Sequence, residues 1–538
     1  MATAAQLIAK RLAEAGCRRV FGVPGGEVLT LMEALRAEGI EFVLTKHENN
    51  AGFMAEGAWS ATGAPPVLLT TIGPGLANAV NVVGNARLDR VPLIVISGAV
   101  DMHERQTYTH QVVDHGAILR PLVKASFEVV PGAADVIADK AVSIAMDAPP
   151  GPVHIDLPVG VAALDEPATA PIRRPTPIPS RPAGGEEMVS ARHLLSGAER
   201  PLIIAGVETL ESKDAPDMLT ALALDFSIPV ITTYKAKGVF PEEDFLSLGA
   251  AGLSPIADRL LMPLIAQSDL LLLVGYDPVE MRHAWTAPWD ASEKPVIEFS
   301  ATPNTHYVHM ANVSFIGDIG SSLKTLSLQL TPNPDSWPDG EPARVRQELA
   351  EAYRADEDWG PAAVADEVRK ALPDDAIACV DSGAHRILLS HVWPCAKPRT
   401  LLQSTGFATM GCALPLAIGA KMAAPERAVV AITGDAGLEM VLGELATLRD
   451  LALPVVIVIY DDASLALIEK KQREAQLPNL GVDYAATDWV ALARAMGGRG
   501  VSVSDRKALG AAVKKGLAAE TFTIVAAQID RKAYDGRL

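Results

Sequence analysis

The residues best suited to chemistry lie at the ends of two apolar segments in the last third of the chain. Gly434-Asp435-Ala436-Gly437 follows residues 429–433, and Asp461-Asp462-Ala463-Ser464 follows residues 455–460. If both segments are parallel strands, their carboxylates share one sheet edge and offer Mg²⁺ the hard oxygen ligands that it prefers. The free N–H groups of a helix that begins near Leu438 favour an anion at the same edge. The pattern therefore predicts a magnesium site that binds a phosphorylated ligand.

Short β-branched apolar segments alternate with amphipathic stretches along the whole chain, which is typical of parallel strands connected by helices. The segments cover residues 67–71, 93–97, 153–157, 202–205, 270–275, 296–299, 377–380, 429–433, 455–460 and 524–529. Two Pro-rich stretches, 163–187 and 331–342, interrupt the alternation and indicate linkers. We therefore predict an α/β protein with three doubly wound parallel-sheet domains, at residues 1–165, 185–330 and 345–530.

The composition of the 538-residue chain narrows the functional classes. Hydrophobic residues at 49% and charged residues at 21% are typical of a globular protein. The formal net charge of −18, without a basic block, disfavours binding to nucleic acid or to anionic membrane surfaces. The four scattered cysteines favour free thiols, and the sequence shows neither a signal peptide nor an apolar stretch long enough to span a membrane. We expect a cytoplasmic protein.

Common catalytic signatures are missing from the sequence. It has no G-x-x-x-x-G-K-[ST] loop, no G-x-S-x-G elbow and no G-x-G-x-x-G fingerprint. His47-Glu48 and His103-Glu104 each lack the second histidine that a zinc protease needs one helical turn away. These absences disfavour a zinc protease and a dehydrogenase that transfers hydride from a dinucleotide.

Residues 418–437, together with the acidic pair at 461–462, resemble the metal–diphosphate signature of thiamine-diphosphate enzymes. The stretches 19–26, 46–57 and 72–78 resemble the pyrimidine-binding domain of the acetolactate synthase and pyruvate oxidase branch of that family. The similarity extends over nearly the whole chain, in the domain order of the family. It implies a pyrimidine-binding, a middle and a diphosphate-binding domain, with thiamine diphosphate and Mg²⁺ as cofactors.

The resemblance implies roles for individual residues. Glu48 matches the glutamate that hydrogen-bonds the aminopyrimidine ring and promotes removal of the reactive proton of the cofactor, and Met410 matches the apolar wedge between its two rings. The implied metal ligands are Asp435, Asp462 and, through its carbonyl, Ser464. The other implied cofactor contacts are Pro74, Asn78, Ala384, His385, Gly434, Ala436, Gly437, Leu467 and Ile468. From the residues alone, Glu48 could also be an acid at a helix N-terminus, Met410 a core side chain and His385 a surface histidine.

The residues around this site favour carboligation over simple decarboxylation. Decarboxylases of the pyruvate decarboxylase type protonate the donor carbon with a His-His pair and a glutamate six residues after the second metal ligand. This chain has no His-His pair, and Ile468 stands in place of that glutamate. A pocket without those proton donors leaves the donor carbon to attack a second carbonyl. Gln111 matches the glutamine near the reacting carbon of acetolactate synthases, and we predict that Gly25, His110, Leu467 and Ile468 border the substrate.

The middle segment and the subunit arrangement follow from the same resemblance. Gly275-Tyr276-Asp277-Pro278-Val279-Glu280 resembles catabolic acetolactate synthases, which use no flavin, and Asp462 in place of Asn is similar to that group. We therefore predict no requirement for FAD. The family places the equivalents of Glu48 and Asp435 of one site on different subunits. This arrangement implies a homodimer at minimum, and a homotetramer as in many relatives.

The substrate pair and the direction of the reaction stay open. Ala436 replaces Gly, Asn49 stands where Gln is frequent, and Leu467-Ile468 replaces Met-Val, so the donor or acceptor can differ from pyruvate. A lyase or decarboxylase that cleaves another 2-oxo acid, a 2-hydroxy ketone or a 1,2-dicarbonyl would use the same cofactor machinery. A non-catalytic, cofactor-binding paralogue is a second alternative. We expect an acetolactate synthase-like transferase that decarboxylates a pyruvate-like 2-oxo acid and ligates it to a second carbonyl.

Overall fold

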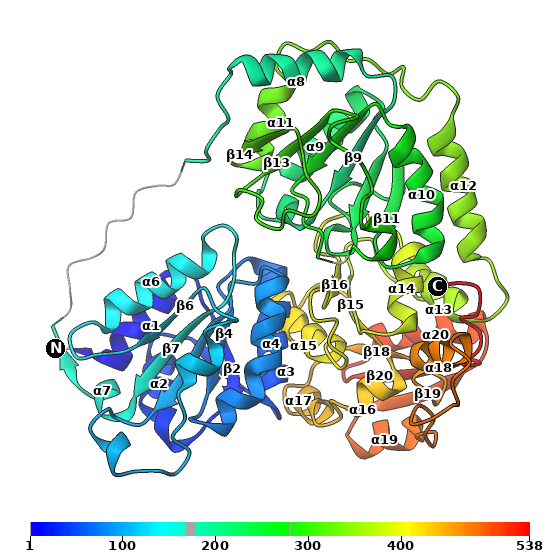
Figure 1. Cartoon of the computed structure of the whole chain (residues 1–538). Helices are drawn as coiled ribbons and strands as arrows, with labels where there is room; N and C mark the ends of the chain where they lie inside the picture. Colours follow the sequence, from blue (N-terminus) through cyan, green and yellow to red (C-terminus); the bar gives the residue numbers. More distant parts are fainter. Residues whose placement is uncertain (1, 168–177, 280) are drawn as a thin grey trace.

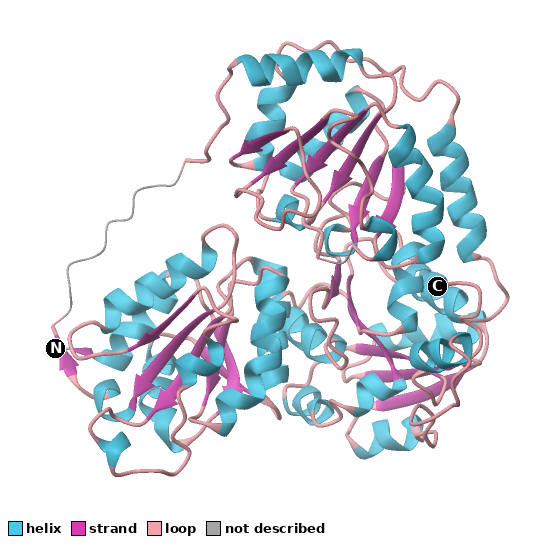
Figure 2. Ribbon diagram, in the orientation of Figure 1, coloured by secondary structure: helices cyan, strands magenta, loops and turns pink. Residues whose placement is uncertain are grey.

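The computed structural model describes residues 2–167, 178–279 and 281–538. They form three α/β units, each built on one six-stranded parallel sheet with helices on its faces (Figures 1 and 2). The predicted fold class is therefore confirmed. Residues 168–177, which fall within the first predicted linker at 163–187, lie outside the described residues.

The N-terminal unit has the strand order β3-β2-β4-β5-β7-β6. Its central strands are buried on both faces, as the continuous apolar segments predict. Strands β1 and β8, from the two ends of this unit, pair antiparallel in a separate two-stranded sheet. Its elements are β1 Ala2–Thr3, α1 Ala4–Glu14, β2 Arg19–Val23, α2 Leu29–Ala37, β3 Glu41–Leu44, α3 Glu48–Thr62, β4 Val67–Thr70, α4 Pro74–Leu88, β5 Ile94–Ala99, α5 His115–Leu119, β6 Ala125–Glu128, α6 Ala134–Met146, β7 Val153–Pro158, α7 Val159–Ala162 and β8 Asp165–Glu166.

The middle unit has the order β11-β10-β9-β12-β13-β14. This is the 3-2-1-4-5-6 arrangement of dinucleotide-binding domains, in which the chain changes direction between its first and fourth strands, here β9 and β12. Helix α12, which includes the predicted domain start at residue 345, packs against α10 of this unit. The elements are α8 Glu186–Gly197, β9 Pro201–Ala205, α9 Ala215–Asp225, β10 Val230–Thr233, β11 Ser247–Ala251, α10 Pro255–Gln267, β12 Leu270–Val274, β13 Val296–Ser300, β14 Val313–Ile316, α11 Ile319–Ser327 and α12 Glu341–Tyr353.

The C-terminal unit has the order β16-β15-β17-β18-β20-β19, which repeats the arrangement of the N-terminal unit strand for strand. The chain changes direction between β15 and β17, and ligands of open parallel sheets bind at the carboxyl ends of strands at such a point. The elements are α13 Pro361–Ala371, β15 Ile377–Val380, α14 Ala384–Val392, β16 Leu401–Gln403, α15 Ala413–Ala423, β17 Val429–Gly434, α16 Asp435–Glu439, α17 Glu444–Asp450, β18 Val456–Asp461, α18 Ala466–Glu474, α19 Trp489–Ala495, β19 Arg499–Val503, α20 Arg506–Leu517 and β20 Thr523–Gln528.

The N-terminal and C-terminal units share one apolar core. The core continues across α3 and α15, two helices that lie side by side where the units meet (Figure 1). Two glycines let these helices touch backbone to backbone. A Cβ atom at Gly57 would lie 2.1 Å from the Leu416 carbonyl oxygen, and one at Gly419 would lie 1.8 Å from that of Met54. The two units therefore pack as one body. Among the described residues, no helix is both long and apolar enough to cross a membrane.

Candidate functional site

Two adjacent strands bring the predicted metal ligands together at one sheet edge. Strands β17 and β18 pair in parallel, so Asp435 and Asp462 follow them at the same end. The Asp435 carboxylate accepts hydrogen bonds from the backbone N–H groups of Ala436 at 2.8 Å, Asp462 at 3.2 Å and Ala463 at 2.6 Å. The Tyr484 hydroxyl donates to the same carboxylate at 2.6 Å. These donors fix the direction of Asp435.

The second carboxylate is arranged as a cation site requires. Burial, and then the nearby Asp435 carboxylate, raise the pKa of Asp462 to about 8. Such crowding of buried acids is unfavourable until a cation neutralises it. The Ser464 hydroxyl donates to Asp483 at 2.8 Å, so its side chain is already engaged, as expected if Ser464 binds metal through its carbonyl. The donor set fits Mg²⁺.

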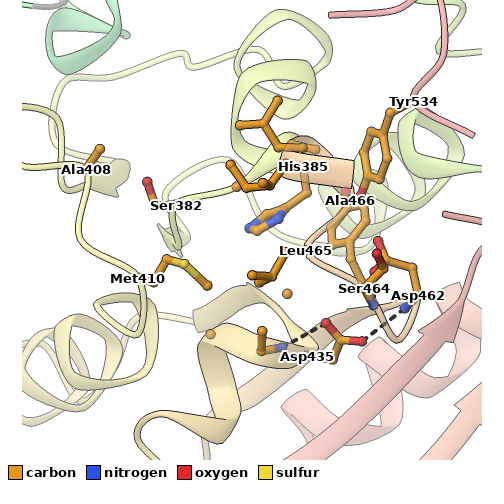
Figure 3. A pocket seen from close by; sticks show the side chains of 18 residues that line it. Ser382, His385, Ala408, Met410, Asp435, Asp462, Ser464, Leu465, Ala466 and Tyr534 are labelled. Atoms are coloured by element: carbon orange, nitrogen blue, oxygen red, sulfur yellow. Dashed lines mark hydrogen bonds between the residues drawn. The ribbon is translucent and has the colours of Figure 1, made fainter. Parts of the chain in front are cut away.

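The predicted contacts of the C-terminal unit line a single cavity of about 200 Å³ (Figure 3). The labelled side chains of Met410, His385, Asp435 and Asp462 surround its central space. The predicted residues in its lining are Ala384, His385, Met410, Gly434, Asp435, Ala436, Gly437, Asp462, Ser464, Leu467 and Ile468. The structure thus brings these residues together, and their binding roles stay predictions.

His385 is a buried side chain at this cavity, and not the surface histidine that was the alternative interpretation. Burial lowers the pKa of His385 to about 3, so the imidazole is neutral. Its ring stacks on Tyr460, with centroids 5.1 Å apart. In the part of the chain that the structure describes, the buried Nε2 atom has no hydrogen-bond partner. An unpartnered polar atom at the cavity fits a polar ligand such as a diphosphate.

Gly437 allows the backbone to pass close to Asp381 beneath the cavity. A Cβ atom there would lie 2.0 Å from Asp381 Oδ2 and 2.8 Å from Thr433 Oγ1. We expect Gly437→Ala to reduce thiamine-diphosphate affinity at least tenfold, because the start of α16 must shift away from the cavity. Isothermal titration calorimetry checks this, with Gly197→Ala, where no atom lies within 4 Å, as the control. Unchanged affinity in Gly437→Ala would contradict the assignment.

The predicted residues of the N-terminal unit form a second cluster. Glu48 is the first residue of α3 and is buried, and Asn78 Nδ2 of α4 donates to its Oε2 at 3.0 Å. Pro74 is the first residue of α4. The resemblance implied a cofactor contact for Asn78, and in the structure this side chain holds Glu48.

Gln111 and His110 lie on an exposed loop beside this cluster. Gly73 has a φ of +60°, and a Cβ atom there would lie 2.7 Å from the Gln111 carbonyl oxygen, so the loop packs on the turn before α4. The Gly73 N–H donates to His115 Nε2 at 3.0 Å. Gly25 lies against Thr71, whose Oγ1 would be 2.1 Å from an added Cβ atom.

The two clusters do not meet in one cavity within the chain. The cavity is lined by residues between Ser382 and Tyr534, so no described residue of the N-terminal unit contributes to it. Two further residues were not predicted from the sequence. Tyr484 holds Asp435, and Glu444 accepts from the Lys46 N–H and the Asn50 amide on either side of Glu48. No motif marks these two residues.

Comparison with protein families assigns all three units. The model of the thiamine pyrophosphate enzyme N-terminal TPP binding domain matches residues 2–118, that of the central domain matches residues 189–326, and that of the C-terminal TPP binding domain matches residues 381–527. The chain belongs to the thiamine pyrophosphate enzyme family. The predicted family is thereby confirmed.

Relatives of this thiamine pyrophosphate enzyme are similar over most of their length. An acetolactate synthase of Bacillus subtilis is 28% identical, with 98% of this chain and 93% of the relative covered. An acetolactate synthase large subunit of Parasynechococcus marenigrum is 32% identical, with 96% and 86% covered. A probable 2-ketoarginine decarboxylase of Pseudomonas aeruginosa is 30% identical, with 92% and 88% covered.

Proposed function

We propose that this thiamine pyrophosphate enzyme decarboxylates a pyruvate-like 2-oxo acid and ligates the product to a second carbonyl. The observation that carries the proposal is the cavity wall next to the proposed metal site, where Leu467 and Ile468 are apolar. The sequence resemblance aligns Ile468 with the glutamate that serves as a proton donor in decarboxylases. An apolar wall there disfavours protonation of the donor carbon and so favours attack on an acceptor. The acetolactate synthases among its relatives support the same reaction class.

Each residue has a part in this proposal. When bound, thiamine diphosphate would supply the nucleophilic carbon for addition to the keto group of the donor. Asp435, Asp462 and Ser464 hold Mg²⁺, His385 and the start of α16 contact the diphosphate, and Met410 supports the rings. Glu48 holds the pyrimidine by a proton-sharing hydrogen bond, and Gln111 approaches the acceptor.

We propose that the working unit is at least a homodimer, with a homotetramer as the larger form. Support comes from the separation of the two clusters, because Glu48 and Asn78 lie outside the cavity that Asp435 and Met410 line. A second copy of the chain can supply the missing half to each cavity. The cytoplasm is the proposed compartment, in line with four cysteines that are all free and buried.

We also propose that the middle unit functions without FAD. The carboxyl ends of β9 and β12, where a domain of this topology binds a dinucleotide, lead into Glu208 and Asp277. Arg90 of the N-terminal unit fills this place, with its guanidinium 2.7 Å from each of the two carboxylates. Burial raises the pKa of the adjacent Glu211 to about 8. An acidic crevice occupied by an arginine disfavours a diphosphate.

Arg90→Met should destabilise the protein without creating a flavin site. The substitution leaves Glu208 and Asp277 without their cation, which costs about 3 kcal/mol for a buried pair. Urea denaturation of wild type and variant measures this loss. Arg36→Met is the control, because its pair with Glu33 is exposed to solvent, which screens the attraction, so the free energy of unfolding should stay close to that of wild type. Visible flavin absorption in the purified wild type would contradict the proposal.

A decarboxylase or lyase is the alternative function, and the probable 2-ketoarginine decarboxylase among the relatives favours it. Proton NMR of the protein with thiamine diphosphate, Mg²⁺ and pyruvate distinguishes the two. We expect acetolactate as the main product. Acetaldehyde alone would show that the donor carbon is protonated, and so would support the decarboxylase. No loss of pyruvate with the cofactor bound would exclude pyruvate as donor and direct the same assay to other 2-oxo acids and 2-hydroxy ketones.

A further inference from the structure

Polar side chains along one side of α4 connect Glu48 with the C-terminal unit of the same chain. Asn78, Asn81 and Asn85 of α4, and Asp89, which caps its C-terminus, are spaced three or four residues apart and so point to the same side of the helix. We call these four residues the α4 ladder. Asn78 donates to Glu48, whereas the other three contact residues 404–410, the loop between β16 and α15. Ala408 and Met410 of this loop line the cofactor cavity.

Asp89 holds the first part of the loop. Its Oδ1 accepts from the Thr405 hydroxyl at 2.6 Å and from the Gly406 N–H at 2.7 Å. Its Oδ2 accepts from the Thr405 N–H at 3.1 Å and from the Lys235 ammonium group at 2.9 Å. Asp89 is only 2% exposed, so these charge-assisted hydrogen bonds are shielded from water. The backbone of the loop therefore takes its position from a carboxylate of the N-terminal unit.

Asn85 and Asn81 hold the second part, next to Met410. The Ser404 hydroxyl donates to Asn85 Oδ1 at 2.6 Å and accepts from the Thr409 N–H at 2.9 Å. Asn81 Nδ2 donates to Thr409 Oγ1 at 3.1 Å. Thr409, the residue before Met410, is thus held through both its backbone N–H and its side chain.

The loop depends on these outside contacts because its own conformation is unfavourable. Ala408 has a φ of +49°, which L-residues seldom adopt. Within the described residues, no backbone–backbone hydrogen bond joins two members of 404–410. The Phe407 ring packs on α4 so closely that a Cβ atom at Gly84 would lie 2.3 Å from its Cζ. Residues on α4 thus supply the order that the loop lacks by itself.

We propose that Asn81, Asn85 and Asp89 are positioning residues that set the 404–410 loop, and with it Met410, against the cofactor. The proposal rests on the proposed function, in which the cavity takes thiamine diphosphate. In the proposed dimer, Glu48 and Met410 of one chain serve different sites. The N-terminal unit therefore shapes the site that its own chain's Met410 lines, although its Glu48 serves the other site.

Hydrogen exchange and cofactor affinity test the positioning role without reference to turnover. In cofactor-free Asn85→Ala, we expect faster exchange of the 404–410 amides, and about tenfold weaker thiamine-diphosphate binding at saturating Mg²⁺. Asn85 Nδ2 also donates to Glu56 Oε2 of α3 at 3.1 Å, so α15 is the control helix, and its amides should stay as protected as in wild type. If Asn85→Ala exchanges its 404–410 amides and binds thiamine diphosphate as wild type does, the proposal is overturned. An equal loss of protection in α15 would also overturn it, because the variant would then weaken the packing of the two units as a whole and not the loop alone.

Thr405→Val keeps the test valid if Asn85→Ala does not fold. It removes only the hydroxyl that donates to Asp89 and leaves the Asp89–Lys235 pair in place. We expect the same two effects, with recovery in Thr405→Ser, which retains the hydroxyl. A Thr405→Ser variant as impaired as Thr405→Val would overturn the role of this hydrogen bond.

Mixed dimers separate this inference from the proposed function. When Glu48→Gln and Asp435→Asn chains are combined, the intact site takes its cavity from the Glu48→Gln chain. Asn85→Ala should weaken cofactor binding at the intact site when placed on the Glu48→Gln chain, and leave it unchanged when placed on the Asp435→Asn chain. Failure of the parent pair to regain activity would overturn the two-chain site. Suppose instead that the parent pair regains activity, but Asn85→Ala weakens cofactor binding equally on either chain or on neither. That result would overturn only the positioning role of the α4 ladder.

Discussion

Glu48→Gln should lose almost all turnover while it keeps its cofactor. Glutamine preserves the shape of the side chain and can still accept the hydrogen bond from Asn78 Nδ2, so the local structure survives. It cannot share a proton as a carboxylate does, and loss of such a group lowers kcat by about 10²- to 10⁴-fold. Product formation followed by proton NMR gives kcat, and calorimetry gives the thiamine-diphosphate Kd, which should change by less than about threefold.

The matched control is Glu33→Gln, a surface substitution in the same unit. Glu33 is exposed and pairs with Arg36 on α2, so both kcat and Kd should equal those of wild type. If Glu48→Gln keeps its kcat, Glu48 is not the proton-sharing group. If it instead loses the cofactor, Glu48 acts in binding or folding. A wild-type protein that binds cofactor but turns over no 2-oxo acid or ketone would favour the non-catalytic paralogue.

Two inactive variants should restore activity when they are combined. Asp435→Asn removes the charge of a proposed metal ligand and should weaken Mg²⁺-dependent cofactor binding at its own cavity enough to abolish turnover there. If each site takes Glu48 from one chain and Asp435 from the other, a mixed dimer of the two variants contains one intact site. Random reassortment of equal amounts then leaves about a quarter of all sites intact. The regained activity, measured after unfolding and refolding the mixture, should approach that fraction.

The double variant Glu48→Gln/Asp435→Asn provides the opposite arrangement. Mixed with wild type, it forms dimers in which both sites carry one defect, so activity should fall below the wild-type share of the chains. A site contained within one chain predicts the reverse of both results: no recovery in the first mixture and no loss in the second. The pair of experiments therefore decides whether the site lies between chains.

The sequence was sufficient to predict that Asp435 and Asp462 share one sheet edge, because a local pattern places each of them. Asp435 and Asp462 each follow an apolar strand, and parallel pairing of β17 with β18 carries them to one edge. Tyr484 was not predicted, although it lies in the same region, because it is 49 residues from Asp435 and no periodicity connects them. The Asp89 contacts to Thr405 and Gly406 cross 316 and 317 residues, so only the packed fold reveals them.

The alternative interpretations of single residues show a similar limit. From its type alone, His385 could be a surface histidine, and only the packing against Tyr460 reveals its burial. The resemblance to the family implied that Glu48 and Asp435 of one chain serve different sites, but the residues of this sequence alone do not indicate that separation. That separation depends on how α3 packs on α15, which local propensity does not determine.

The backbone contact between Gly57 and Leu416, and that between Gly419 and Met54, limit how this protein can be recombined with its relatives. A chimera that takes its first third from one parent and its last third from another combines helices from different sources at this contact. Any side chain at either glycine would collide with a main-chain carbonyl that cannot move aside. Crossover points should therefore keep α3 and α15 from a single parent, and exchange of the middle unit between parents is the better tolerated route.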